Sequence, residues 1–335
     1  MSAYERRAWE QSLRRLHEPP HKALIPKKVR EVAHTATEKA LAFADEHLPA
    51  ATVKSIVEKT MNGMLELTFN PALRSASAES ALAGYQKRHE SLTSLKDLKA
   101  LDIEDLDRFR RRKGLYVATS AAQGTATSLA VTGTVVSTTV SGGVTAGVAV
   151  AAIAADTVAS LAMMGRSVGS VAVRYGYDPR LPDEELFAMG VLSLGMAGTL
   201  EAKHTALAAL SRLTQQMMRQ ATWRQLNEHV LVRVIGRVYQ LLGLRLTQRK
   251  LAQTVPFVGI GINAALNANM TRHAYQRAED VYRLRFLSEK YGVDPRDWLD
   301  GVEFARSDPD GGAELPDVVE ILEEEILEEE RRTDA

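Results

Sequence analysis

Apolar residues recur every three or four positions along most of this chain, as Leu161, Met164, Val168 and Val171 do. That spacing places them on one face of an α-helix, where they can pack against other helices. Prolines, glycines and short polar stretches separate one such segment from the next. The pattern predicts an all-α, multi-helix bundle with helices over residues 4–16, 25–46, 49–69, 82–95, 103–112, 161–175, 182–213, 223–246 and 260–291.

Two of these segments end in nearly the same phrase. Residues 175–180 read Tyr-Gly-Tyr-Asp-Pro-Arg, and residues 291–296 read Tyr-Gly-Val-Asp-Pro-Arg. Glycine tolerates the left-handed conformation that often follows a helix, and the residue before a proline is disfavoured in one. We interpret the two copies as helix-stop signals, because a phrase this short does not make a structural repeat.

One segment departs from this pattern: residues 114–155 contain no charged residue, although 25% of the chain is charged. These 42 residues consist mainly of Ala, Gly, Ser, Thr and Val. A segment of this kind is hidden from water, either in the protein core or in a bilayer. Its length permits two helices of about 20 residues each, joined by a bend near residues 141–143.

Three placements of this uncharged segment compete: a core hairpin, a membrane hairpin and a β-hairpin. Thr, Val and Ile, which favour strands, supply 17 of the 42 residues. The basic run over residues 108–113 resembles the inner flank of a membrane span, but a solvated helix end has the same composition. Ser and Thr supply 12 residues and Leu only two, which leaves little drive into hydrocarbon. The composition therefore favours a central Gly/Ala/Thr-rich helical hairpin within the protein.

Composition also bounds the organisation of the 335-residue chain and its chemistry. The formal net charge is zero and there is no cysteine, so nothing indicates nucleic-acid binding, and disulfides and thiolate metal sites are excluded. The eight histidines lack metal-ligand spacing, and we expect no metal and no cofactor. We predict an N-terminal amphipathic helix over residues 1–20, a helical domain over 21–300, and a linker with an acidic C-terminal helix over 301–335.

The N-terminal helix carries a cluster of basic residues beside a tryptophan. Arg6, Arg7, Arg14 and Arg15 accompany Trp9, a combination that favours contact with an anionic membrane surface. The alternative is a solvated helix that packs its tryptophan on the domain. Because this end of the chain has no apolar segment of the signal-peptide type, we expect a cytoplasmic protein, peripheral on the inner face of the cell membrane.

Three short motifs match patterns of catalytic or cofactor sites. Residues 17–21 read H-E-x-x-H, but two consecutive prolines prevent the regular helix that a zinc protease needs. Residues 259–264 read G-x-G-x-x-A, but a proline-containing segment precedes them instead of a buried strand. Residues 165–169 read G-x-S-x-G around Ser167, within a helical period and not after a strand. Close helix packing explains this last motif better, and a serine hydrolase using Ser167 is the enzymatic alternative.

A buried polar cluster is the remaining candidate site. Asp156 is the only charged residue between Gly114 and Gly165, and burial raises the pKa of a carboxyl group that has no partner. Asn263 and Asn267 stand four positions apart, on one face of a later predicted helix. We expect Asp156, Asn263 and Asn267 to meet, either to lock the helices together or to bind a small head group.

Several phrases of the chain, taken in order, resemble the EcsC family of bacterial proteins. The resemblance spans roughly residues 4–292 and rests on the following residues: Trp9, Pro19-Pro20, residues 25–29 (IPKKV), Ala154-Ala155-Asp156, residues 175–178 (YGYD), residues 184–188 (EELFA), residues 255–259 (VPFVG), Asn263, Asn267 and residues 285–287 (RFL). The Thr- and Val-rich segment before Asp156 and the acidic tail depart from the family's pattern.

The resemblance implies an α-helical, membrane-proximal accessory protein and no defined enzyme. The family is named from an association with an ABC-type exporter system, so the expected partner is a membrane transporter component or an anionic membrane surface. Three hypotheses follow: a noncatalytic protein linked to an ABC-type transport or secretion system, a serine hydrolase using Ser167, and a soluble helical scaffold. Membrane binding through the N-terminal arginines would distinguish the first hypothesis from the other two.

Overall fold

The computed structural model describes residues 1–19, 71–108, 160–197, 200–219, 259–300 and 331, with side chains from residue 270 onward in the segment 259–300. Every regular element among these residues is helical, which confirms the all-α prediction. The uncharged segment 114–155 lies outside the described residues, as do the predicted helices over 25–46, 49–69 and 223–246 and the acidic tail.

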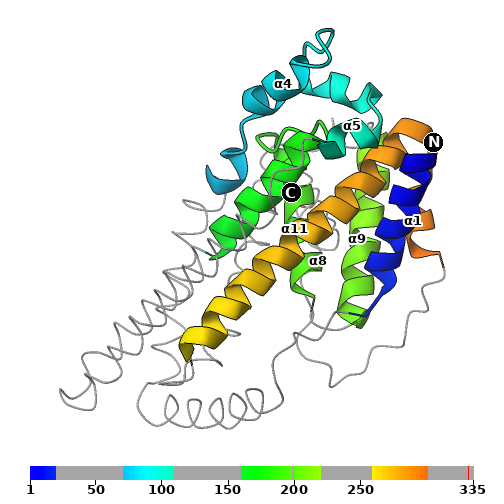
Figure 1. Ribbon diagram of the computed structural model, residues 1–335. Helices are drawn as coiled ribbons and strands as arrows, with labels where there is room; N and C mark the ends of the chain where they lie inside the picture. Colours follow the sequence, from blue (N-terminus) through cyan, green and yellow to red (C-terminus); the bar gives the residue numbers. More distant parts are fainter. Residues whose placement is uncertain (20–70, 109–159, 198–199, 220–258, 301–330, 332–335) are drawn as a thin grey trace, which may run out of the picture.

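Among the described residues the longest helix is α11 (Gly259–Tyr291), which runs diagonally through the molecule in Figure 1 and organises the bundle. It packs against α8 (Pro182–Met196) and against the N-terminal helix α1 (Ala3–His17). α9 (Leu200–Arg219) packs against α8 and against the 3₁₀ helix η3 (Pro295–Leu299). A further helix spans residues 160–174. The short elements α4 (Ala78–Gln86), η1 (Leu95–Ala100) and α5 (Ile103–Arg108) lie near one end of this assembly.

α8 lies at the centre of the core and is buried on nearly all sides. Its residues from Leu186 to Val191 are all fully buried, as expected for a helix that is apolar all round. Two glycines allow neighbouring helices to approach it closely. A Cβ atom at Gly190 would lie 2.7 Å from a methyl carbon of Leu210, and one at Gly195 would lie 3.0 Å from the Cα of Ala274.

Two predicted helices have different bounds in the structure. The segment 182–213 is not one helix: α8 ends at Met196, because Ala197 leaves the helical region at φ −58° and ψ 120°. The helix predicted over 82–95 begins earlier, at Ala78, and ends at Gln86. Its start is set by Ser77, whose hydroxyl accepts a hydrogen bond from the backbone N–H of Ser80 at 3.0 Å.

The two helix-stop phrases form the same local structure. Gly176 and Gly292 have φ values of 85° and 66°, and in each copy the residue after the glycine donates its backbone N–H to the carbonyl five positions earlier. The aspartates then cap the following turn, since Asp178 and Asp294 each accept from the backbone N–H of the arginine two positions on. The interpretation as helix stops is confirmed.

We expect Gly176→Ala to destabilise the protein more than Gly292→Ala. Both positions have positive φ, which costs a residue with a Cβ about 1 kcal/mol. At Gly176 the new Cβ would also lie 2.7 Å from the carbonyl oxygen of Leu95, whereas at Gly292 it would have no neighbour within 4 Å. Denaturant unfolding should show a loss of about 1 kcal/mol for Gly292→Ala and about 3 kcal/mol for Gly176→Ala. Equal losses would contradict the close approach at Gly176.

Candidate functional site

α1 directs its arginines in two directions. Arg6, Arg7 and Arg14 are exposed to solvent, while Trp9 is half-buried and packs against the hydrophobic core. The fourth predicted contact residue differs from these three. Arg15 Nη2 lies 2.7 Å from a carboxylate oxygen of the buried Asp280, and 34% of the Arg15 side chain is exposed. Arg15 thus forms an ion pair with the interior of the protein, and its contact with a membrane surface stays a prediction.

Two basic side chains contact the carboxyl end of α1: Lys203, which is buried, and Arg277, which is partly buried. Lys203 of α9 donates hydrogen bonds from Nζ to the carbonyl oxygens of Arg15, at 2.9 Å, and Glu18. Arg277 of α11 donates to the same Arg15 carbonyl at 2.7 Å. The last carbonyls of a helix have no partner within the helix and carry the negative end of its dipole. Basic side chains from two other helices therefore hold α1 by hydrogen bonds to its last carbonyl groups.

At the amino end of α1, the side chains of Tyr4 and Glu5 form hydrogen bonds with residues of other elements. Glu5 is fully buried, and its carboxylate accepts hydrogen bonds from Lys290 Nζ at 2.8 Å and from the Tyr291 hydroxyl. The Tyr4 hydroxyl donates to Asp107 at 2.8 Å. Burial, followed by the hydrogen bond to Asp107, raises the pKa of Tyr4 to about 12. α1 is thus fixed to the bundle at both ends by polar contacts.

The C-terminal half of α11 carries buried ion pairs on several sides. Arg285 makes two parallel hydrogen bonds to Glu184 of α8, at 2.8 and 2.6 Å, and both side chains are less than 7% exposed. Its guanidinium carbon lies 4.1 Å from the ring centre of Tyr177 and 4.4 Å from that of Phe187. Burial opposes the charge of Arg285, but Glu184 and Tyr177 hold its pKa well above the usual value.

Two further arginines pair across the same region. Arg283 donates to Asp107 at 2.7 Å and to the Tyr175 hydroxyl at 3.1 Å. Arg174, on the helix over 160–174, donates to Glu279 of α11 at 2.8 Å. Buried pairs of this kind add little net stability, because desolvation offsets much of their attraction, but removing one partner is costly. The short distances between these side chains are met in one register of α11 against its neighbours.

Sequence reasoning did not predict this buried network, although it quoted several of its members. Tyr175, Tyr177, Glu184, Phe187 and Arg285 all belong to the phrases on which the family resemblance rests. One feature of the sequence could have indicated the network. Charged and aromatic residues are mixed over 275–291, so α11 has no continuous polar face and some of its charged residues must be buried.

Ser167 lies within the helix over 160–174 and is fully buried. Its hydroxyl donates to the Met164 carbonyl at 2.7 Å. Beside it, a Cβ atom at Gly169 would lie 2.4 Å from the carbonyl oxygen of Leu73. The glycine motif thus allows close contact between this helix and the segment around Leu73, as the packing interpretation expects.

The proposed polar cluster falls largely outside the part of the chain that the structure describes. Asp156 is not among the described residues. Asn263 and Asn267 lie in the first turns of α11, which confirms the helix predicted there. Their meeting with Asp156 stays a prediction. Among the described residues, no group of acidic or histidine side chains has the arrangement of a metal site, and no helix is long and apolar enough to cross a membrane.

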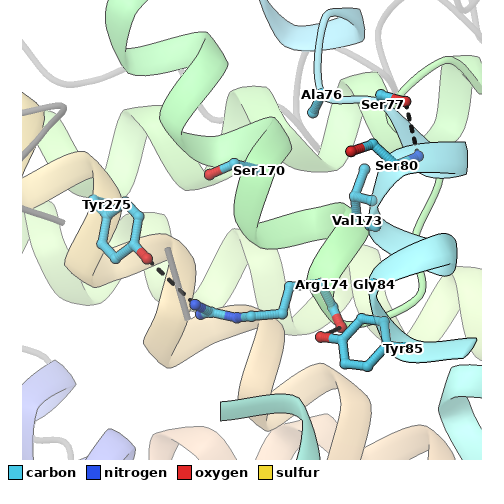
Figure 2. Close-up of a pocket in the computed structure, with 10 residues that line it drawn as sticks. Ala76, Ser77, Ser80, Gly84, Tyr85, Ser170, Val173, Arg174 and Tyr275 are labelled. Atoms are coloured by element: carbon cyan, nitrogen blue, oxygen red, sulfur yellow. Dashed lines mark hydrogen bonds between the residues drawn. The ribbon is translucent and has the colours of Figure 1, made fainter. Parts of the chain in front are cut away.

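A cavity of about 140 Å³ lies between α4, the helix over 160–174 and α11. Its lining includes Ser77, Ser80 and Ser170, and the larger side chains of Arg174 and Tyr275. Figure 2 shows Arg174 reaching toward Tyr275, whose hydroxyl accepts its hydrogen bond at 3.3 Å. Ser77 and Ser80 are exposed, whereas Arg174 and Tyr275 are buried, so the cavity has exposed residues on one side and buried polar residues on the other.

The comparisons with known proteins found one similarity. The model of the EcsC protein family matches residues 132–287, within the longer span over which the sequence phrases resemble that family. The match includes both partners of two buried pairs, Arg285 with Glu184 and Arg174 with Glu279. No curated protein and no solved structure matches the chain.

We expect Arg285→Gln to destabilise the protein severely, because it leaves the Glu184 carboxylate buried without its cation. Loss of one member of a buried pair costs about 3–5 kcal/mol. Arg180→Gln is the control, since Arg180 is 47% exposed and pairs at the surface with Asp178 and Glu79. That change should cost about 1 kcal/mol or less. Similar free energies of unfolding for the two variants would contradict the buried role of Arg285.

The pKa of Lys203 generates a prediction about pH. Burial, followed by repulsion from Arg277, lowers this pKa from 10.5 to about 7. The folded state disfavours the ammonium form of Lys203, so protonation of this side chain favours unfolding. Its contribution to the free energy of unfolding is therefore complete above pH 10.5 and is lost as pH falls to about 7. The free energy of unfolding should therefore rise between pH 7 and pH 9, by about 2 kcal/mol.

Lys203→Met should abolish this rise, and Lys87→Met, at an exposed position, should retain it. Denaturant unfolding at a series of pH values measures the slope. An unchanged slope in Lys203→Met would show that the rise comes from other groups. The pKa of Asp280, raised by burial to about 6, acts in a separate window: its contribution is complete below pH 3.8 and is lost as pH rises to about 6.

Proposed function

Because the chain belongs to the EcsC protein family over residues 132–287, we propose that it is a noncatalytic accessory protein of the inner membrane surface. In this proposal it works on the cytoplasmic face, beside an ABC-type transport or secretion system. The observation that carries the surface contact is the exposed set of Arg6, Arg7 and Arg14 on α1.

The geometry of α1 favours electrostatic contact over insertion. Trp9 packs against the core and Leu16 is fully buried, so the apolar side of the helix is already occupied by the protein. The exposed arginines lie on the opposite side, where Glu10 is also exposed. A basic group near an anionic membrane contributes about 1 kcal/mol, and this attraction weakens beyond about 8 Å at physiological ionic strength.

The polar contacts at both ends of α1 support the same proposal. Glu5 holds the first turn through Lys290, and Lys203 holds the last carbonyls. A helix fixed in this way presents its exposed guanidinium groups at constant positions on a rigid surface. Binding then orders few additional groups, which lowers the entropic cost of association.

We expect the variant Arg6→Gln, Arg7→Gln, Arg14→Gln to lose binding to anionic vesicles. Three charges at about 1 kcal/mol each correspond to a decrease in partition of up to about 100-fold. Co-sedimentation with vesicles of phosphatidylglycerol and phosphatidylcholine, repeated at increasing salt, measures the effect. Wild-type binding should weaken with salt, because exposed charges are screened.

The matched control is Lys87→Gln, Arg88→Gln, Lys96→Gln, which removes the same number of cations from exposed positions outside α1. It should bind vesicles about as well as the wild-type protein. Equal losses in the two triple variants would show that net charge alone governs binding. If the wild-type protein does not bind anionic vesicles but co-purifies with a soluble partner, the result would support the hypothesis of a soluble helical scaffold.

A further inference from the structure

The exposed side of α1 is positively charged, and residues 314–330 of the same chain carry the opposite charge. This acidic segment contains nine Asp or Glu residues and no Lys or Arg. We propose that it binds the exposed arginines of α1 and competes there with an anionic membrane. The competition rests on the proposed function, whereas the contact between the two segments does not. The acidic segment lies outside the described residues, and its charge, its length and its point of attachment support the contact.

Three arginines on the exposed side of α1 face solvent. Arg6, Arg7 and Arg14 are exposed, whereas the ion pairs that α1 forms with other described elements involve Glu5 and Arg15. Glu10 is also exposed, so the exposed charged side chains of this helix sum to +2. The outer side of α1 therefore attracts an acidic partner.

The formal net charge of zero conceals a strong separation of charge along the chain. All 42 Lys and Arg residues lie outside the acidic segment, together with 33 of the 42 Asp and Glu residues. The acidic segment therefore carries −9 and the rest of the chain +9. Opposite charges on one chain attract each other at an effective concentration on the order of millimolar, because the chain between them keeps them close.

The described segment 259–300 ends close to the last turn of α1. Trp298 of η3 is fully buried, and its carbonyl oxygen lies 2.8 Å from Nε2 of His17. His17 is the last residue of α1, and Arg14 precedes it by about one helical turn. The acidic segment is thus attached to the fold near the arginines that we propose it binds.

The connection to the acidic segment is long enough to reach all three arginines. Residues 301–313 are 13 residues and span at most about 45 Å when fully extended. α1 has 15 residues and is about 22 Å long. The acidic segment can therefore lie along the whole exposed side of the helix.

A pair of fluorescent labels tests the contact in the absence of a membrane. The chain contains no cysteine, so labels attach only to cysteines that are introduced. Gln11 is exposed on α1, and Thr333 follows the acidic segment. In the full-length variant Gln11→Cys, Thr333→Cys we expect energy transfer between the two labels. The transfer should fall as salt is added, because exposed charges are screened.

Two further sets of substitutions in the labelled chain show which cations are responsible. Arg6→Gln, Arg7→Gln, Arg14→Gln should lower the energy transfer, and the matched change Lys87→Gln, Arg88→Gln, Lys96→Gln should leave it as it is. Circular dichroism checks that each variant is folded. Unchanged transfer in the α1 variant, or an equal loss in both variants, would overturn the contact with the α1 arginines.

Vesicle binding tests the competition. In the tail variant, the six glutamates of residues 323–325 and 328–330 are replaced by glutamine. If each exposed ion pair favours the contact about twofold, three pairs favour it about tenfold. The tail variant should therefore bind anionic vesicles up to about tenfold more tightly than the wild-type protein.

The same tail substitutions in the Arg6→Gln, Arg7→Gln, Arg14→Gln protein are the control for net charge. Competition for these arginines predicts a smaller gain in vesicle binding there than in the wild-type background. An equal gain in both backgrounds would overturn the competition. If none of these proteins binds vesicles, the proposed function and the competition are both wrong, whereas the energy transfer still decides whether the acidic segment contacts α1.

Discussion

The described structure depends on the pairing of Arg285 with Glu184 in the core. A guanidinium group taken out of water needs a carboxylate with matching geometry, and Glu184 supplies both of its oxygens. This requirement sets α11 against α8 in one rotation and one register. The same constraint applies along the helix, because Arg283 pairs with Asp107 and Glu279 pairs with the buried Arg174. Helices whose contacts were only apolar would tolerate small shifts that these pairs exclude.

The docking of α1 follows from the same principle. Its buried side is unusually polar for a short helix, with Glu5 and Ser12 fully buried, and its two ends meet charged groups of α9 and α11. Contacts of this type specify position more than they stabilise. The result is a helix whose inner side is committed to the bundle and whose outer side presents arginines to solvent.

Both proposals depend on this outer side of α1. The proposed surface contact involves the exposed arginines of α1, which are not part of the buried network. These arginines would be attracted electrostatically to an anionic membrane. The buried network holds α1 in place, and the exposed arginines outside it supply the positive charge.

Helix positions were largely predictable from the sequence, because a helix forms from contacts between residues three or four positions apart. The starts and ends of α1 and α11, and the two glycine stops, follow from such local patterns. The break after Met196 was missed, since the residues around it remain apolar and helix-compatible. The Gly165–Gly169 packing site was also recognisable, although its partner Leu73 was not.

Only the tertiary structure decided which charges meet. Arg285 and Glu184 are 101 positions apart, and Arg15 and Asp280 are farther still, so no local period relates them. From the sequence we grouped Arg15 with the other arginines of α1, because composition gives the charge of a side chain but not the group that it contacts. Packing turned it inward, and packing alone left a cavity beside Arg174. By itself the sequence determined an all-α chain, because helix formation is local, and a similarity to the EcsC family over residues 132–287. Partners, burial and the cavity depend on contacts between distant residues.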